Sequence, residues 1–386
     1  MAILSVEHVR IAFVSDAAYP WSVGGLEAVE GTEAVGLAQR HQLHFFSLRW
    51  PGMKANFVYK NVHYHTFHDI RHDRFYRHGR RSIREAGLFT LYTLTLFKYR
   101  FDVIQVNQFP YFQLPIVKIY CMLTGCKMII DVVEVWDRSY WVEYLANKSA
   151  GRLASRFSSW ALGLGDAFIA NSSVTADNLA GLGIERGRIN VFSPVVDDIT
   201  IRNVRQKRRD NTIIFSGRLI KEKRFDKWLN VVKEVSRKIP SLKAILIGEG
   251  PESENIKKMI ANYGLAKTVE FRKFYPESRI RELYSAIKSA DLLLNMSERE
   301  GLSIIGLQSL ALGTPVVLPD YSPIPKEVRD MCVIESERNI ANTVVKILRS
   351  SNKKQYIRNI DRLKAFSKSN VNDFYTRMFR KLGIEE

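Results

Sequence analysis

Short apolar runs of strand length alternate with longer stretches of helical spacing along the whole chain. The first run, residues 10–15, ends at Asp16 and leads through a glycine-bearing loop into helical spacing from about Leu26 to Gln39. Further apolar runs lie at 44–48, 102–106, 127–131, 166–171 and 188–191. Such alternation is typical of a parallel sheet covered by helices on both faces. The pattern predicts an α/β domain over residues 1–197.

A polar, basic stretch then interrupts the pattern, and we place a linker at residues 198–211. A second cycle follows, with apolar runs at 212–216, 242–247, 268–271, 290–295 and 314–318. This cycle predicts a second α/β domain over residues 212–365. We expect residues 366–386 to form a C-terminal helix that packs back on the first domain. The predicted fold class is α/β with two Rossmann-like domains.

The segment after the run at 212–216 has the residue types that bind phosphate. Gly217 allows a tight turn and a close approach of a ligand to the backbone. Arg218 and Lys223 then place two positive charges near the strand ends, where open α/β sheets bind ligands. Arginine contacts phosphate through two parallel hydrogen bonds, and lysine adds a point charge. The alternative is a solvated basic loop.

A second segment, residues 295–317, combines an acidic loop with the start of a helix. Glu298 and Glu300 lie in the loop, and we expect the helix to begin within 301–303 and to end before Gly313. The first backbone amides of such a helix, at residues 302–304, are free to bind a diphosphate. This segment therefore predicts an anion site.

The side chains of Glu300 and Gln308 are about two helical turns apart and share one side of this helix. Both can accept hydrogen bonds from hydroxyl groups. The alternative is that Glu300 only caps the helix and that Gln308 is an exposed helical position.

Together, these segments resemble the nucleotide-sugar site of GT-B glycosyltransferases, in particular the retaining glycosyltransferase family 4 (glycosyl transferases group 1). Gly248-Glu-Gly-Pro251, the pair Gly24-Gly25 and Asn171-Ser-Ser173 also match that family. The resemblance implies two Rossmann-like domains whose parallel sheets face each other across a cleft. It also implies transfer of a hexose from a UDP- or GDP-sugar to a glycan or a polyprenyl- or other lipid-linked acceptor. Retention of configuration and the absence of a metal or other cofactor are further implications.

The resemblance also assigns roles to particular residues. It implies catalytic roles for Glu300 and Glu134, and closure of the loop at Gly24 and Gly25 over the reacting phosphate. The implied donor-binding residues are Gly217, Arg218, Lys223, Gly248, Glu298, Leu302, Ser303, Ile304 and Gln308.

Two positions depart from the family pattern. Gln308 replaces the second glutamate of the family motif, and Val133 stands where relatives commonly have a histidine. An amide can still bind a ribose hydroxyl, but it lacks the charge that strengthens the bond. A degenerate, non-catalytic binding protein therefore remains an alternative.

The formal net charge of +18 predicts an anionic partner. A basic nucleic-acid-binding protein is an alternative, but the chain has no helix-turn-helix, zinc-finger or RNA-recognition signature, so no nucleic acid is expected. A dinucleotide-dependent dehydrogenase is disfavoured because Ser253 stands where the third glycine of that fingerprint is required.

The three cysteines show no zinc spacing, and we expect them to be buried thiols. The N-terminus lacks a signal-peptide core, and the longest apolar run, residues 88–97, is too short to span a bilayer. A cytoplasmic location, with possible attachment to the inner face of the membrane, is therefore expected.

Arginines recur at close to helical spacing in residues 71–84, just before the stretch 88–99, which is rich in Leu, Phe and Tyr. The pattern predicts a basic amphipathic helix that faces an anionic membrane surface or a lipid-linked acceptor. A solvated helix face is the alternative. The residues concerned are Arg71, Arg74, Arg77, Arg80, Arg81 and Arg84.

Overall fold

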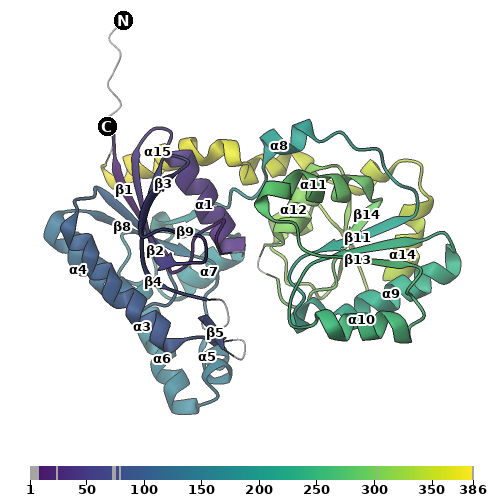
Figure 1. Cartoon of the computed structure of the whole chain (residues 1–386), viewed down its shortest axis with the longest axis horizontal. Coiled ribbons are helices and arrows are strands. Elements are labelled where there is room, and N and C mark those ends of the chain that lie inside the picture. The colour runs from purple at the N-terminus through teal and green to yellow at the C-terminus, as the bar shows by residue number, and fades with distance from the viewer. Residues whose placement is uncertain (1–7, 23–24, 72–74, 78–79, 301, 385–386) are drawn as a thin grey trace, which may run out of the picture. The chain divides into compact units, whose positions relative to one another are not determined.

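The computed structural model describes residues 8–22, 25–71, 75–77, 80–300 and 302–384. The chain divides into two compact units. The first unit consists of Met1–Pro194 together with Asn370–Glu386, and the second is Val195–Ser369. Each unit is an α/β layer structure with its own sheet, its own hydrophobic core and helices on the sheet faces (Figure 1).

The sheet of the first unit has the strand order β10-β9-β8-β7-β1-β2-β4-β3. All neighbours are parallel except β3 and β4. The strand order reverses between β1 and β7, and open sheets bind ligands at such a reversal, beyond the carboxyl ends of the strands. The strands are β1 (Arg10–Val14), β2 (Gln42–Arg49), β3 (Asn56–Tyr59), β4 (Val62–Asp69), β7 (Val103–Asn107), β8 (Lys127–Val132), β9 (Ala167–Ala170) and β10 (Ile189–Val191).

Helices from both ends of the chain cover this sheet. The final helix packs against the first one, and Phe374 stacks on Phe192 with ring centroids 3.9 Å apart. The helical elements of the unit are α1 (Gly25–Leu37), α3 (Ile83–Tyr92), the 3₁₀ turn η1 (Thr93–Lys98), α4 (Gln113–Thr124), α5 (Arg138–Leu145), α6 (Lys148–Leu162), α7 (Ser173–Gly181), η2 (Arg186–Arg188) and α15 (Val371–Leu382).

The sheet of the second unit is entirely parallel, with the order β13-β12-β11-β14-β15-β16. Its order reverses between β11 and β14. The fully buried Trp228 fixes this point, because its indole N–H donates to the carbonyl of Leu294 at 3.1 Å. The strands are β11 (Thr212–Ser216), β12 (Lys243–Ile247), β13 (Val269–Arg272), β14 (Leu292–Leu294), β15 (Val316–Pro319) and β16 (Val333–Glu335).

The helices of the second unit lie between these strands and on both faces of the sheet (Figure 1). They are α8 (Asp198–Asn203), η3 (Lys221–Lys223), α9 (Phe225–Lys238), α10 (Ser253–Asn262), η4 (Glu277–Arg279), α11 (Ile280–Ser289), α12 (Ile304–Ala311), α13 (Lys326–Arg329) and α14 (Ile340–Arg349). Three 3₁₀ turns complete the unit, η5 (Lys353–Tyr356), η6 (Ile360–Phe366) and η7 (Lys368–Asn370).

The predicted fold class is confirmed, since both units are built on parallel sheets, and all three cysteines are buried and unpaired as expected. Two predictions about local structure are wrong. Helix α8 occupies part of the predicted linker at 198–211, where the Asp197 carboxylate caps it by accepting from Thr200 N at 2.9 Å. Residues 366–386 begin with 3₁₀ turns before α15 starts at Val371.

The prediction of one helix through the arginines of residues 71–84 is also wrong. This segment contains two short paired strands, β5 (Tyr76–Arg77) and β6 (Arg80–Arg81), and α3 begins only at Ile83. The hydroxyl of Ser82 accepts from Glu85 N at the start of that helix. A serine in this position ends the preceding extended chain and starts a helix, because it satisfies an amide that has no helical partner.

Three carboxyl groups are buried beneath the first sheet. Glu30 and Glu33 on α1 accept hydrogen bonds from Asn107 at 2.7 Å and Gln105 at 2.9 Å. Burial raises the pKa of Asp131 on β8 from 3.8 to about 7. Burial, together with the charge of Asp131, raises the pKa of Glu30 and of Glu33 well above its ordinary value. The folded first unit therefore holds protons that the unfolded chain releases.

This difference makes the stability of the first unit depend on pH. A carboxyl group with a raised pKa in the folded state contributes stability below its unfolded pKa, and that contribution is lost as the pH rises through the folded pKa. For Asp131 the loss extends from its unfolded value of 3.8 up to about 7. We expect Asp131→Asn to melt higher than the wild type at about pH 8 and to lose that advantage at about pH 4. About 1 kcal/mol corresponds to roughly 2–4 °C in the melting temperature of a unit this large.

Melting curves measured across this pH range test the expectation. Glu143→Gln, at an exposed position on α5, is the matched control and should follow the wild type. A lower melting temperature for Asp131→Asn at alkaline pH would contradict the proposed burial of a charge.

Candidate functional site

Two loops meet where the strand order of the second sheet reverses. Residues 217–224 follow β11, and residues 295–303 follow β14. The two strands are parallel neighbours, so both loops leave the same edge of the sheet. The sequence reasoning selected these same two segments, and the topology brings them together.

An ion pair joins the two loops at their centre. The ammonium group of Lys223 contacts Oε2 of Glu300, and both side chains are only 15% exposed. Asn295 at the end of β14 donates from Nδ2 to the same oxygen at 3.2 Å. Both contacts engage Oε2, so among the described residues Oε1 of Glu300 keeps its capacity to accept from a ligand hydroxyl.

Arg224 forms a second link between the loops. It adopts a left-handed backbone conformation, with φ of 51°, and its guanidinium contacts Asp226 at 2.7 Å and Glu298 at 2.6 Å. These two hydrogen-bonded carboxylates raise the pKa of Arg224 above its ordinary value. Glu298 also donates its backbone N–H to the carbonyl of Glu222 at 3.1 Å. Glu298, a predicted donor-binding residue, therefore braces the loops through Arg224.

The glycines at the ends of β11 and β12 let two backbones run close together. Gly217 N donates to Ile247 O at 3.0 Å, and Leu219 N donates to Glu249 O at 2.9 Å. A Cβ atom on Gly248 would collide with the carbonyl oxygen of Gly217. Gly248 therefore holds the loop that carries Arg218 in place, and only a glycine fits there.

Arg218 itself is exposed, and it makes no hydrogen bond or ion pair with any of the residues that the structure describes. Its guanidinium is thus available to an anion. The sequence assigned Arg218 to phosphate binding, and its position on the loop after β11 is compatible with that role.

Helix α12 begins at Ile304, slightly later than the start predicted within 301–303. Ser303 precedes it in a left-handed conformation with φ of 59°, and Leu302 is buried. The hydroxyl of Ser303 is 2% exposed and has no hydrogen-bond partner among the described residues. The first amides of an α-helix also lack intrahelical acceptors. This helix start therefore has unsatisfied donors of the kind that bind a diphosphate.

Gln308 makes a contact that a glutamate could not make. Its Nε2 donates to the carbonyl oxygen of Val195 at 3.1 Å, within the second unit. A carboxylate has no hydrogen to donate. The side-chain amide therefore ties α12 to the first residue of the unit, while its oxygen remains an acceptor.

In the first unit, Glu134 is exposed in the loop after β8. Its carboxylate accepts from the indole N–H of Trp136 at 3.1 Å. Gln108, at the end of β7, accepts from Val133 N at 2.8 Å and donates to Glu134 O at 2.6 Å, which fixes this loop. Gly25 begins α1, and Gly24 lies outside the described residues.

Arg81 does not belong to an exposed basic surface. Its guanidinium binds the buried Asp16 at 2.5 Å and lies over the rings of Phe75 and Phe109. Arg71 and Arg84 are exposed. Arg74 and the side chains of residues 77 and 80 lie outside the described part of the chain. The arginine run therefore does not form the single basic face predicted for it.

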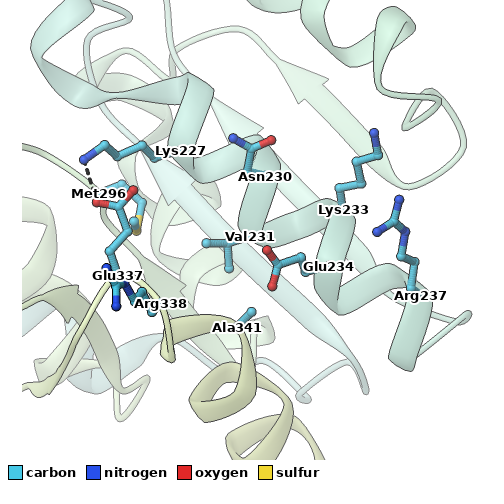
Figure 2. Close-up of a pocket in the computed structure, with 10 residues that line it drawn as sticks. All are labelled: Lys227, Asn230, Val231, Lys233, Glu234, Arg237, Met296, Glu337, Arg338 and Ala341. Carbon is cyan, nitrogen blue, oxygen red and sulfur yellow. Dashed lines mark hydrogen bonds and ion pairs between the residues drawn. The ribbon is translucent and has the colours of Figure 1, made fainter.

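The best-formed pocket lies on another part of the second unit. It has a volume of about 600 Å³ between the outer face of α9 and the start of α14 (Figure 2). Lys227 and Glu337 form an ion pair at its edge, with Nζ and Oε2 2.6 Å apart. None of the predicted donor-binding residues lines it. Among the described residues, no group of three or more His, Cys, Asp or Glu side chains is arranged to hold a metal ion.

Sequence reasoning missed three residues that organise these loops: Asn295, Arg224 and Gln108. Asn295 and Gln108 come directly after buried strands, which is a readable signal for a side chain at the ligand-binding edge of a sheet. Arg224 had no such signal, because its bridging role depends on its left-handed backbone.

Comparison with known proteins supports the same assignment. The model for Glycosyl transferases group 1 matches residues 197–363, and that for Glycosyltransferase Family 4 matches residues 23–198. The phosphatidylinositol N-acetylglucosaminyltransferase of Arabidopsis thaliana contains a polypeptide that is 26% identical over 157 residues, 40% of this chain and 34% of that protein. A D-inositol 3-phosphate glycosyltransferase of Acidothermus cellulolyticus is 29% identical over 184 residues, 43% of this chain and 40% of that protein. The chain thus spans about a third to two fifths of the length of these relatives.

Solved structures match over nearly the whole chain. HepE from Anabaena, in complex with UDP and glucose, has a TM-score of 0.69 at 14% identity, covering 97% of this chain and 100% of that one. Sucrose-phosphate synthase from Thermosynechococcus elongatus has a TM-score of 0.73 at 15% identity, covering 97% of this chain and 99% of that one. At such low identity, these matches establish the fold.

The family resemblance of the two loop segments is therefore confirmed by independent matches to both halves of the chain. The two parallel sheets, each with one reversal of strand order, agree with the architecture of the matching structures. The chain belongs to glycosyltransferase family 4, the glycosyl transferases group 1, and it has the GT-B fold.

Proposed function

We propose that the chain transfers a hexose from a UDP-sugar to a hydroxyl group of a glycan or a lipid-linked acceptor. The observation that carries the proposal is the Lys223–Glu300 pair at the strand-order reversal of the second sheet. One residue of this pair suits a diphosphate and the other suits a sugar hydroxyl, so their contact joins the two halves of a nucleotide-sugar site.

The diphosphate of the donor is held by positive charge and backbone amides. Arg218 and Lys223 supply the charges, and the first amides of α12 with the hydroxyl of Ser303 supply hydrogen-bond donors. Donors fixed in place before the reaction stabilise the charge that develops on a leaving diphosphate. These groups make a metal ion unnecessary. Related structures bound to UDP support UDP as the nucleotide, and GDP is the alternative.

Glu300 accepts a hydrogen bond from the transferring sugar through Oε1, while Lys223 and Asn295 hold Oε2. In the reaction, the bond from the anomeric carbon to the phosphate oxygen breaks, and a bond to the acceptor oxygen forms on the same face of the sugar. The acceptor proton passes to the leaving phosphate oxygen, which retains the configuration. Glu134 on the first unit orients the acceptor side of the reaction.

The names of the relatives support a lipid-linked or phosphorylated acceptor. One is named for phosphatidylinositol and another for D-inositol 3-phosphate. Both acceptors combine a hydroxyl group with a negative charge. The net charge of +18 is suited to an acceptor of this kind.

A second candidate function is donor binding without turnover. It is favoured by Gln308, whose amide nitrogen is engaged by Val195, and by Val133 in place of the common histidine. Binding and turnover must therefore be measured separately.

Thermal shift with UDP tests the donor site. A ligand at about 100 times its Kd adds roughly 2.7 kcal/mol of stability, so UDP should raise the melting temperature of the wild type. We expect Arg218→Ala to lose most of that rise, because its guanidinium has no other partner among the described residues. Arg237→Ala, which removes an arginine from the α9 pocket, is the matched control. A full UDP shift in Arg218→Ala would place the diphosphate elsewhere, and a shift with GDP alone would change the nucleotide.

Turnover of UDP-sugars separates the two candidate functions. We expect Glu300→Gln to lower kcat on the order of 100-fold or more, as the removal of a group that stabilises a transition state does, while the UDP thermal shift persists. Glu234→Gln, on the exposed side of α9, should leave kcat unchanged. A wild-type chain that binds UDP but hydrolyses or transfers no UDP- or GDP-sugar would establish the binding-only function.

Unfolding in denaturant tests the role of Gln308. Gln308→Glu replaces a donor with a carboxylate oxygen that faces the carbonyl of Val195. A buried polar group without its partner costs about 1–3 kcal/mol, so the free energy of unfolding of the second unit should fall by that amount. Gln308→Ala should cost less, because it adds no repulsion. An unchanged stability of Gln308→Glu would show that the contact is dispensable.

A further inference from the structure

Large apolar side chains face solvent on four neighbouring helical elements of the first unit, α3, η1, α4 and α6. Each of these side chains is between 44% and 75% exposed. Soluble proteins seldom expose a contiguous apolar surface of this extent unless it binds something. We call this set the apolar face, and it comprises Ile83, Leu91, Leu94, Phe97, Phe112, Ile119, Met122, Leu123, Leu153 and Trp160.

The apolar face is one continuous surface. Helix α4 packs against α3, η1 and α6, and these elements lie together in Figure 1. The ring of Phe112, next to α4, lies 5.5 Å from that of Phe157 on α6. Phe157 in turn contacts Trp160 at 5.7 Å. Phe97 on η1 lies 5.4 Å from Tyr120 on α4. Aromatic contacts thus connect the exposed side chains across three elements.

The spacing of these residues shows that the exposure is organised. Ile119, Met122 and Leu123 lie three and four residues apart on α4, the spacing of one helix face. Leu153, Phe157 and Trp160 repeat that spacing on α6. A surface helix normally turns such a stripe toward the core. Here, α4 and α6 bury other residues and also present an apolar stripe to the outside.

The charges on the same elements have one sign at the surface. The only acidic residue in the sequences of α3, η1, α4 and α6 is Glu85, which is buried and contacts His68 at 3.0 Å. The exposed charged residues are basic: Arg84, Lys98, Lys148, Arg152 and Arg156. An apolar face bordered only by cations is complementary to an anionic lipid surface, which offers both an apolar layer and negative charge.

We propose that the apolar face binds the surface of an anionic lipid bilayer. The side chains of Trp160, Phe97 and Phe112 enter the boundary between headgroups and acyl chains, where aromatic rings are favoured. The basic residues contact the anionic headgroups. None of the described helices is long and apolar enough to cross a membrane, so this contact is attachment to one surface.

This proposal goes beyond the proposed function and does not rest on it. The apolar face belongs to the first unit, and the residues of the donor site belong to the second. If the acceptor is lipid-linked, attachment would confine the protein to the surface that carries it.

Vesicle flotation with the full chain tests the proposal. We expect the wild type to float with vesicles of phosphatidylcholine and phosphatidylglycerol, and to float at least tenfold less with phosphatidylcholine alone. Met122→Glu/Leu123→Glu should abolish flotation, because it places two anions in the middle of the apolar face. The matched controls are Val58→Glu on β3 and Ile199→Glu on α8, whose side chains are similarly exposed but lie on other elements. Both should float like the wild type.

Two further measurements separate the components of binding. Arg152→Gln/Arg156→Gln should weaken binding to the anionic vesicles by roughly tenfold or more, and added salt should reduce the difference from the wild type. Tryptophan emission should shift to the blue on vesicle addition, and Trp160→Phe should lose that shift. The thermal shift with UDP serves as the folding control and should remain in every variant, so a failed vesicle test leaves the donor proposal standing.

The proposal is overturned if the wild type does not float, or if the glutamate pair floats like the wild type. It is also overturned if the wild type is a dimer in light scattering and Met122→Glu/Leu123→Glu is a monomer. That result would assign the apolar face to a second copy of the chain.

Discussion

The parallel pairing of β11 with β14 is the constraint on which the donor site depends. It brings two loops far apart in sequence to the same edge of the sheet, one cationic and one acidic. Lys223 and Glu300 then compensate each other's charge in a half-buried position, where either charge alone would be costly. Arg224 repeats the connection on the outside of the loops. The loops are therefore held together before any ligand binds, which is what preorganisation requires.

Much of this arrangement could be predicted from the sequence because it depends on local signals. The strand at 212–216 was predicted with the bounds that the structure gives it, and the adjoining basic loop was assigned to phosphate. The reversal of strand order could not be read from the same signals, since it depends on which distant strands pair. The bridging role of Arg224 and the contact between Gln308 and Val195 were missed for the same reason. Side-chain partners far apart in sequence leave no periodic trace.

The segment 71–84 shows how a sequence pattern can mislead. Its arginines have nearly helical spacing, but Ser82 begins a helix only at their end, and Arg81 is drawn inward by the buried Asp16. The expectation of a membrane-facing element rested on that spacing. The exposed apolar residues of α4 and α6, which lie elsewhere in the sequence, drew no attention, because a pattern alone does not say which face of a helix is covered. Exposure is a property of tertiary packing.

The discontinuity of the first unit has a consequence for how the chain folds. Helix α15 completes its core, and Tyr375 donates to Gln105 at 2.6 Å in the buried centre. Residues 195–369, the whole second unit, lie between these two partners. A nascent chain that has emerged only as far as residue 194 therefore lacks a wall of its first core, and its apolar groups there stay open to water or to chaperones. The first unit to be synthesised is thus the last to be finished.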